Sequence, residues 1–220
     1  MNMSVKKQFM LLDGYPLLYY SLRTFQLSFI DEITVVTSAG DEDYVREDII
    51  ERYGFDKAVK VVTGGSERYL SVYEGLKAAG ECDYIFIHDC ARAFVTEEIL
   101  KGCLEGVREY GACTAAVPCK DTIKLSDEDG FFCDTPDRSR LWQIQTPQVF
   151  EYGLIRDTYE ELIPSLDLYL RRGMNITDDT MLVEELMNRR VHPSMGSYNN
   201  IKVTTPEDVI LGEAILKAIK

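Results

Sequence analysis

Short apolar runs rich in β-branched residues alternate with helical patterns through the first half of the chain. The apolar runs span 32–38, 58–62, 83–88 and 112–118, and the helical patterns span 41–53, 67–79 and 96–110. Parallel strands are joined by crossover connections, usually helices, so this order predicts βαβ units. We expect an α/β fold with a Rossmann-like, mainly parallel sheet flanked by helices, in a single domain over 1–220. Such sheets bind ligands at the carboxyl ends of their strands.

The alternation stops at 119–148, where two extended runs flank Asp-Glu-Asp-Gly. An Asp-Gly turn between extended runs is typical of a hairpin, so we expect an antiparallel β-arm there that leaves the main sheet. Further helices are predicted at 151–162 and 177–187, a last strand at 200–204, and a terminal helix that Thr205-Pro206 opens. The helix at 17–25 is preceded by a stretch without a β-branched apolar run.

The net charge of the chain bears on which molecules it can bind. The chain has 24 Lys and Arg against 37 Asp and Glu, a net charge of −13. Such a chain lacks the broad basic face of non-specific nucleic-acid binding, although a few converging cations can still bind a small anion. No apolar run approaches the roughly 20 residues of a membrane helix, and the start lacks the pattern of a signal peptide. We expect a cytoplasmic protein without nucleic-acid or membrane partners.

Six cysteines occur without a Cys-x-x-Cys pair, beside two histidines. This spacing offers no ligand grouping for a structural zinc ion. We expect buried, reduced thiols.

The string His-Asp-Cys-Ala-Arg ends the apolar run at 83–88, where an α/β sheet carries its chemistry. Asp89 offers oxygen ligands to Mg²⁺, and Arg92 offers a bidentate grip on phosphate. The alternative is structural: Asp89 accepts backbone amides at a turn and pairs with Arg92.

Three other places carry suitable groups. Gly64-Gly65-Ser66 precedes a helix whose free amides suit an anion, and we expect Ser66 to cap that helix and Ser71 to face the same cleft. A double glycine is equally common in ordinary turns. Lys202 lies in the expected last strand, where a buried lysine needs an anion beside it, whereas an exposed one points to water.

Cationic and amide side chains also gather at the chain start and in the arm. Lys6-Lys7 precedes the first helix, and the string from Arg138 to Gln148 holds the single Trp of the chain. The plain alternatives are a solvated lysine pair and an arm that packs on a partner surface.

Taken together, these strings resemble a known family. In order they are Lys-Lys-Gln-Phe, Gly-Gly-Ser-Glu-Arg, His-Asp-Cys-Ala-Arg, Lys-Asp-Thr-Ile-Lys, Asp-Arg-Ser-Arg-Leu-Trp-Gln-Ile-Gln-Thr-Pro-Gln, Ile-Thr-Asp-Asp and Asn-Ile-Lys-Val-Thr-Thr-Pro-Glu-Asp. The order resembles the 2-C-methyl-D-erythritol 4-phosphate cytidylyltransferases of isoprenoid precursor synthesis, over nearly the whole chain. The Thr-Pro-Gln and Asn-Ile-Lys strings are the most specific part.

The resemblance implies an enzyme that joins CTP to methylerythritol phosphate and releases diphosphate, with Mg²⁺ as cofactor and no covalent intermediate. The chemistry then asks for positioning and charge neutralisation. The implied roles are catalysis for Lys7, Arg138 and Lys202; nucleotide binding for Gly65, Ser66, Ser71, Asp89 and Cys90; substrate binding for Arg92, Thr122, Arg138, Thr146 and Lys202; and metal binding for Asp89.

The resemblance also implies a homodimer that exchanges its arms, so that Thr122 and Arg138 serve the partner subunit's site. Small departures from the family pattern are Cys90 and Ala93 within the His-Asp string, and Asn199 where many relatives carry Asp.

The largest departure is at the front. Relatives begin with a central strand and a glycine-rich loop that carries a catalytic arginine, and this sequence shows neither before Lys6. Loss of that strand leaves two neighbouring strands unpaired, at about 1–3 kcal/mol per buried unpaired group. From the resemblance we expect an N-terminally truncated chain that folds poorly or is inactive. Two alternatives stay open: a ribitol-5-phosphate cytidylyltransferase and a non-catalytic dimeric paralogue.

Overall fold

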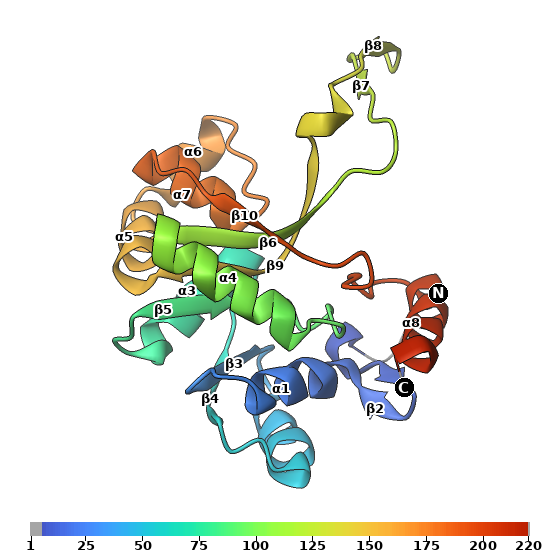
Figure 1. Ribbon diagram of the computed structural model, residues 1–220. Helices are drawn as coiled ribbons and strands as arrows, with labels where there is room; N and C mark the ends of the chain where they lie inside the picture. The colour runs from blue at the N-terminus through green and yellow to red at the C-terminus, as the bar shows by residue number, and fades with distance from the viewer. Residues whose placement is uncertain (1–5, 220) are drawn as a thin grey trace.

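A four-stranded sheet forms the centre of the molecule in a computed structural model that describes residues 6–219 (Figure 1). Its strands lie in the order β10 (His192–Met195), β6 (Ala112–Pro118), β9 (Trp142–Glu151) and β5 (Tyr84–Ile87). β10 runs parallel to β6, whereas β9 runs antiparallel to both β6 and β5. Three of the four strands therefore share one direction, and β9 makes the pairing mixed. The predicted α/β class is confirmed.

β3 (Ile33–Thr37) and β4 (Ala58–Thr63) form a separate parallel pair. Within residues 6–219, β3 pairs with β4 alone and β5 pairs with β9 alone, so the ladder is interrupted between β3 and β5. Two short antiparallel pairs complete the strands described: β1 (Leu11–Leu12) with β2 (Tyr15–Pro16), and β7 (Leu125–Ser126) with β8 (Phe132–Asp134).

Helices cover both faces of the central sheet because successive strand residues point to opposite sides. Cys113 and Ala115 pack with the buried face of α4 (Glu97–Tyr110). Ala112 and Phe150 instead pack with side chains of α3, α5 and α7. Those helices span Arg68–Ala79, Tyr152–Leu162 and Asp179–Met187.

The remaining helical segments surround these layers. They are η1 (Lys7–Phe9), α1 (Leu17–Leu27), α2 (Glu42–Tyr44), η2 (Val45–Glu51), η3 (Arg138–Arg140), α6 (Leu166–Arg171) and α8 (Pro206–Ile219). α1 and η2 pack on β3 and β4 through Leu22, Val35 and Ile49. The helix expected over 41–53 thus forms with a π-helical middle. No helix within residues 6–219 has the length and apolar character to cross a bilayer.

Cap residues set two helix starts where the sequence predicts them. The Thr96 hydroxyl accepts from the Ile99 amide at 3.4 Å, and the Thr205 hydroxyl accepts from the Asp208 amide at 3.3 Å. The expected cap at Ser66 is wrong. α3 begins at Arg68, and Glu67 takes the N-cap position without a side-chain hydrogen bond.

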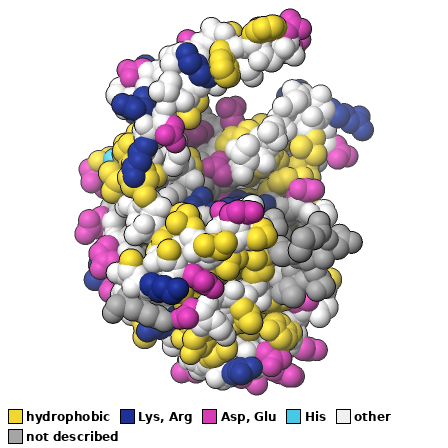
Figure 2. Space-filling view, turned by 90° about the vertical axis from the view of Figure 1, so that its right-hand side faces the viewer, with side chains coloured by type: hydrophobic (Ala, Val, Ile, Leu, Met, Phe, Trp, Pro, Cys, Tyr) yellow, Lys and Arg dark blue, Asp and Glu magenta, His cyan; other side chains and the backbone are white. Residues whose placement is uncertain are grey.

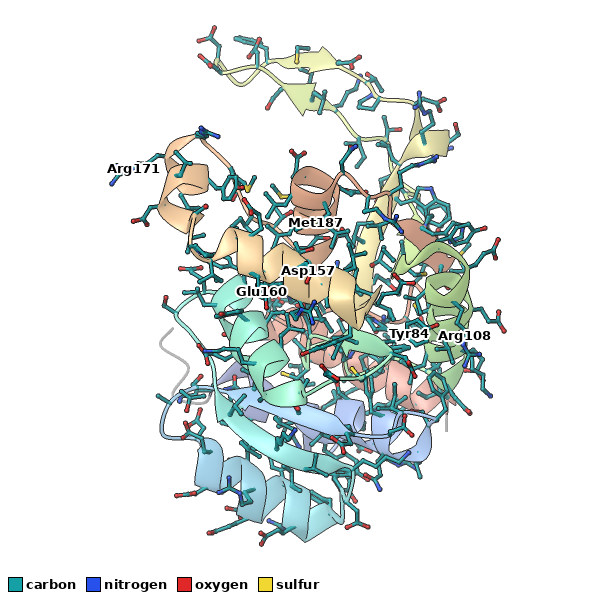
Figure 3. The ribbon with its side chains drawn as sticks, turned by 90° about the vertical axis from the view of Figure 1, so that its left-hand side faces the viewer. Tyr84, Arg108, Asp157, Glu160, Arg171 and Met187 are labelled. Atoms are coloured by element: carbon teal, nitrogen blue, oxygen red, sulfur yellow. The ribbon has the colours of Figure 1, made fainter. Side chains whose placement is uncertain are left out.

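The antiparallel arm stands away from the body of the molecule (Figure 1; Figure 3). β7 (Leu125–Ser126) and β8 (Phe132–Asp134) pair at its tip. Its expected end at 148 is wrong, since 142–148 belong to β9 in the main sheet. Arm formation is confirmed, while arm exchange stays a prediction.

The strand expected at 200–204 is also wrong. That segment is irregular, and the amide of Val203 donates to the Ala91 carbonyl at 2.8 Å as an isolated contact. The sheet instead ends with β10, in a His-Pro-Ser-Met string. All six cysteines are free, as expected, although Cys82 and Cys133 are exposed rather than buried.

Candidate active site

The Asp89 carboxylate, just after the carboxyl end of β5, contacts two cations from distant parts of the chain. Arg68 Nε, at the start of α3, lies 3.1 Å from Oδ1. Lys202 Nζ, from the segment before α8, lies 2.7 Å from Oδ2. Among the described contacts Arg92 forms no ion pair with the Asp89 carboxylate, although its backbone amide donates to the Asp89 carbonyl at 2.9 Å. Asp89 and Lys202, which were singled out separately from the sequence, thus lie together.

These two cations fix the charge of Asp89. Burial raises the pKa of its carboxyl, but Arg68 and Lys202 together outweigh burial and bring the pKa to about 2. Asp89 is therefore ionised at neutral pH. The Lys202 side chain is 46% exposed, so its ammonium sits at an open face of the cluster and can also meet an anion from solvent.

Arg68 bridges Asp89 to a second carboxylate that is fully buried. Its Nη2 lies 2.8 Å from Asp179 Oδ2. The other carboxylate oxygen of Asp179 accepts from the Tyr159 hydroxyl at 2.6 Å. The backbone amide of Asp179 donates to Gln148 Oε1 at 2.9 Å. Burial opposes the charge on Arg68, but Asp179 and then Asp89 raise the pKa of the guanidinium above its ordinary value. Arg68 thus connects the buried core, through Asp179, to the candidate site, through Asp89.

A half-buried histidine positions the Asp89 loop. His88 Nε2 lies 3.2 Å from the Arg92 carbonyl, and Nδ1 lies 3.0 Å from Thr146 Oγ1. A carbonyl only accepts, so Nε2 carries the proton and Nδ1 accepts from the Thr146 hydroxyl. Thr146 Oγ1 in turn accepts from the Asp89 amide at 3.1 Å. Burial lowers the pKa of His88 to about 4, so the ring is neutral at pH 7.

Arg92 holds main-chain carbonyls instead of an acid. Its two terminal nitrogens donate to the carbonyls of Asn200 at 2.8 Å and Ile144 at 3.2 Å. The Asn200 amide group donates to the Thr146 carbonyl at 3.0 Å. Arg92 therefore ties the Lys202 segment to β9, and its phosphate-binding role stays a prediction.

The glycine loop after β4 lines a small cavity of about 230 Å³ beside the cluster. Gln8, Ser38, Gly65, Ser71 and Cys90 are among its lining residues. A Cβ added at Gly65 would lie 2.3 Å from the Leu70 Cβ, so the close approach of loop and helix needs glycine there. Burial raises the pKa of the Cys90 thiol to about 12, which keeps it neutral.

Three predicted residues do not join this cluster in the described chain. Thr122 and Arg138 are exposed on the arm, where Arg138 Nη1 donates to the Lys120 carbonyl at 2.8 Å. Ser66 is exposed ahead of α3. Lys7 begins η1, and its side chain lies outside the described part of the structure. Lys and Arg side chains gather along a hollow below the arm (Figure 2).

Sequence reasoning missed Arg68 and Asp179. Both stand in quoted strings, Gly-Gly-Ser-Glu-Arg and Ile-Thr-Asp-Asp. Their pairing depends on a contact between α3 and α7 that spacing along the chain does not reveal. The signal available was chemical, because a fully buried acid requires a cation or several donors nearby.

Comparison with known proteins agrees with this geometry. The family model for 2-C-methyl-D-erythritol 4-phosphate cytidylyltransferase matches residues 1–218. A protein of that name from Lachnoclostridium phytofermentans is 45% identical over 99% of this chain and 91% of its own length. One from Clostridium botulinum is 45% identical over 100% of this chain and 93% of its own.

Solved structures show the same likeness. The 4-diphosphocytidyl-2C-methyl-D-erythritol synthase of Anaerococcus prevotii superposes with a TM-score of 0.85 at 35% identity, covering 96% of this chain and 90% of that one. The 2-C-methyl-D-erythritol 4-phosphate cytidylyltransferase of Thermus thermophilus superposes with a TM-score of 0.77 at 26% identity, covering 96% of this chain and 94% of that one. The chain belongs to the 2-C-methyl-D-erythritol 4-phosphate cytidylyltransferase family.

Proposed function

We propose that this chain transfers the cytidylyl group of CTP to 2-C-methyl-D-erythritol 4-phosphate. A phosphate oxygen of the polyol attacks the α-phosphorus of CTP, a new P–O bond forms, and the bond from the α-phosphorus to the bridging oxygen breaks. Diphosphate leaves with the electron pair. The products are 4-diphosphocytidyl-2-C-methyl-D-erythritol and diphosphate. Such a step needs alignment and charge neutralisation rather than a protein nucleophile.

The observation that carries the proposal is the joining of Asp89, Lys202 and Arg68 at the carboxyl edge of the sheet. Lys202 supplies a positive charge at the open side of the cluster, where a phosphate can approach. Asp89 and Arg92 fix the Lys202 segment, one through the ion pair and the other through the Asn200 carbonyl. The small cavity at Gly65 offers a neighbouring place for part of the nucleotide.

Mg²⁺ fits this site as a cation held mainly by substrate. Within residues 6–219, no three Asp, Glu, His or Cys side chains gather to hold a metal. Mg²⁺ typically takes one or two carboxylates and completes its shell with phosphates and water. Asp89, ionised and partly exposed, is the carboxylate suited to it. When bound, the ion would neutralise charge on the triphosphate.

We further propose a cytoplasmic homodimer that uses the arm. The arm carries exposed apolar side chains at its tip, with Phe131 73% and Phe132 75% exposed. Burying them against a second copy is favourable, and a two-fold interface would present Thr122 and Arg138 of each arm to the other copy. This arrangement explains why both residues lie apart from the cluster within one chain.

Diphosphate release in the presence of CTP and Mg²⁺ tests the proposal. Protein is kept in excess over substrate, so that a slow chain still gives measurable product. Lys202→Met removes the cation at the open face, and we expect the rate to fall about 100-fold, the size of losing one transition-state donor. Lys101→Met is the matched control, because Lys101 pairs with Glu97 on the exposed face of α4. Equal rates for the two variants would contradict the role of Lys202.

A polyol comparison separates the alternatives. Faster release with ribitol 5-phosphate than with methylerythritol phosphate would favour the ribitol enzyme. CTP binding without release with either polyol would favour the non-catalytic paralogue.

A further inference from the structure

Two neighbouring residues of β9, Gln145 and Thr146, contact the two chain segments that meet at the ion pair of Asp89 and Lys202. Thr146 Oγ1 accepts from the Asp89 amide at 3.1 Å. The Gln145 side chain contacts the loop 196–200, which leads directly into Lys202. Both side chains are buried. One strand therefore contacts the segment that carries the acid and the segment that carries the cation.

An irregularity in β9 allows both contacts. Thr114 of β6 lies opposite Gln148 of β9. Two residues further along β6, Ala116 lies opposite Ile144, so that three residues of β9 face one residue of β6. Such a bulge re-aims side chains out of the ordinary alternation of a strand. Adjacent side chains, which normally point to opposite faces, here both contact segments of the site.

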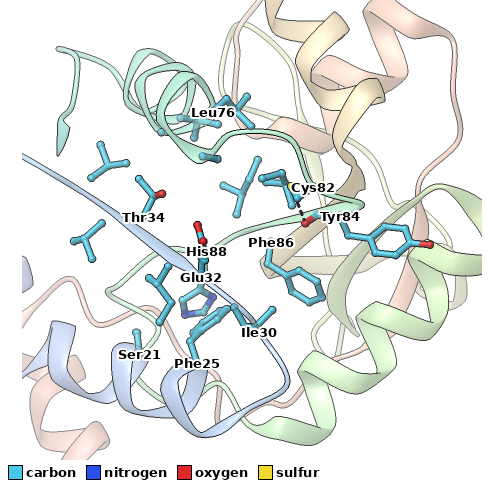
Figure 4. Close-up of a pocket in the computed structure, with 18 of the residues that line it drawn as sticks. Ser21, Phe25, Ile30, Glu32, Thr34, Leu76, Cys82, Tyr84, Phe86 and His88 are labelled. Atoms are coloured by element: carbon cyan, nitrogen blue, oxygen red, sulfur yellow. Dashed lines mark hydrogen bonds between the residues drawn. The ribbon is translucent and has the colours of Figure 1, made fainter. Parts of the chain in front are cut away.

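On the acid side, Thr146 is itself held in place. Its Oγ1 lies 3.0 Å from His88 Nδ1. The His88 ring packs against Phe25 with a centroid distance of 5.2 Å, at the wall of a cavity of about 860 Å³ between β3 and β5 (Figure 4). The Asp89 amide thus meets a hydroxyl whose position a second ring fixes.

On the cation side, the Gln145 amide group binds the loop with both of its polar atoms. Nε2 donates to the Ser197 carbonyl at 2.8 Å. Oε1 accepts from the Ser197 amide at 3.4 Å and from Asn200 Nδ2 at 3.3 Å. The Ser197 carbonyl also accepts from the Asn200 amide, at 2.9 Å. A single side chain thus holds the turn from Ser197 to Asn200 through three contacts.

The loop approaches Gln145 too closely for a side chain at its first residue. A Cβ added at Gly196 would lie 2.4 Å from Gln145 Oε1, so this approach needs glycine. Gln145 is 6% exposed and Asn200 has no exposed surface. Buried amide groups without partners are unfavourable, so their mutual contacts hold the loop in this conformation.

Lys202 depends on this loop because little else directs it. It lies in an irregular segment, and its ion pair with Asp89 is open to solvent. An exposed ion pair contributes little by itself, since it orders a long side chain and is screened. Arg92 holds the Asn200 carbonyl, and Gln145 holds the turn ahead of it. The place of the Lys202 ammonium is therefore set by the anchors of the backbone before it.

We propose that Gln145 is a positioning residue for Lys202, which fixes the loop 196–200 so that the ammonium stays beside Asp89 at the open face of the cluster. Gln145 acts through the backbone of the loop and needs no contact with either substrate. For its effect on turnover, this inference rests on the proposed function.

Trace acetylation of lysines tests the position of Lys202 without turnover. The protein reacts briefly with acetic anhydride at constant pH, and mass spectrometry gives the ratio of acetylation at Lys202 to that at Lys101, the exposed reference on α4. Gln145→Met should raise this ratio about fivefold or more, the shift that the net contribution of one hydrogen bond gives. Gln26→Met is the matched control and should leave the ratio unchanged. Gln26 Oε1 accepts from the Lys57 amide at 3.0 Å, ahead of β4 and away from the site.

A second variant disturbs the same contact from the side of the loop, in case Gln145→Met does not fold. Gly196→Ala displaces the Gln145 amide group by the close contact of its Cβ, and it should raise the ratio in the same way. Gly153→Ala is its control, because a Cβ there meets open space.

Steady-state kinetics separate positioning from a purely structural role. The kcat of Gln145→Met should fall about 10- to 100-fold, the cost of a misplaced reacting group. The KM for CTP should stay unchanged, because the nucleotide is proposed to lie at Gly65 on another segment. An unchanged acetylation ratio in both Gln145→Met and Gly196→Ala, or an equal rise in Gln26→Met, would overturn the proposal. The ratio requires no turnover, so it decides the role of Gln145 separately from diphosphate release, which decides the proposed function.

Discussion

Substitution of Arg68 by Met tests how much its ion pairs with Asp179 and Asp89 stabilise the fold. Asp179 has no exposed surface, and its ion pair with Arg68 spans 2.8 Å. Removing one partner of a buried pair typically costs about 3–5 kcal/mol. Arg68 keeps 31% of its side chain exposed, so solvent screening places the loss at the lower end, ~3 kcal/mol. For a chain of this length that lowers Tm by roughly 6–12 °C.

Urea unfolding followed by circular dichroism measures the loss, and a double-mutant cycle attributes it. Arg68→Met combined with Asp179→Asn removes the buried charge as well, and should recover at least half of the lost stability. Arg156→Met is the surface control, since Arg156 and Asp157 are both well exposed, and its cost should stay below about 1 kcal/mol. A loss for Arg68→Met no larger than that of Arg156→Met, or a double variant no more stable than the single one, would contradict the stabilising role of this buried ion pair.

Three further predictions concern pH, the glycine loop and the arm. In the folded chain the pKa of His88 is about 4, below its ordinary 6.5, so the unfolded chain binds a proton at this ring first as pH falls. The free energy of unfolding should therefore drop by up to about 3 kcal/mol between pH 6.5 and 4. In urea titrations over the same pH range, the variant His88→Asn should lack this loss. Gly65→Ala places a Cβ 2.3 Å from the Leu70 Cβ, and calorimetry should show the affinity for CTP reduced about tenfold or more, about 1.4 kcal/mol. Gly153→Ala is the control variant, because a Cβ there meets open space, and it should bind CTP with unchanged affinity. Phe131→Ser with Phe132→Ser should turn a dimer into a monomer in sedimentation equilibrium; an unchanged mass would contradict the arm interface.

The strand and helix order was predictable because the apolar runs at β3, β4, β5 and β6 are short, rich in apolar residues and separated by helical patterns. β10 was missed because His-Pro-Ser-Met carries no strand pattern; it forms through its parallel register with β6. The strand expected at 200–204 has that pattern, but Asn200 and Arg92 fix it as a connection instead. In both segments, tertiary contacts and not the strand propensity of the local sequence decide the backbone conformation.

The site was predictable where chemistry follows strand ends and unpredictable where it depends on packing. Asp89 follows an apolar strand, and an acid there attracts cations such as Lys202. The partner of Arg68 could not be predicted, since Asp179 lies more than 100 positions further along the chain. The predicted poor folding stays a prediction, and the urea midpoint of the unaltered chain tests it.

Cytidylyl transfer is chemistry at the α-phosphorus of CTP. Phosphorus NMR of the protein with CTP, Mg²⁺ and methylerythritol phosphate follows that atom directly. We predict loss of the triphosphate signals, appearance of free diphosphate, and a pair of coupled resonances from the new diphosphate diester. Triphosphate signals that persist with stoichiometric protein, while calorimetry shows CTP bound, would contradict cytidylyl transfer by this chain.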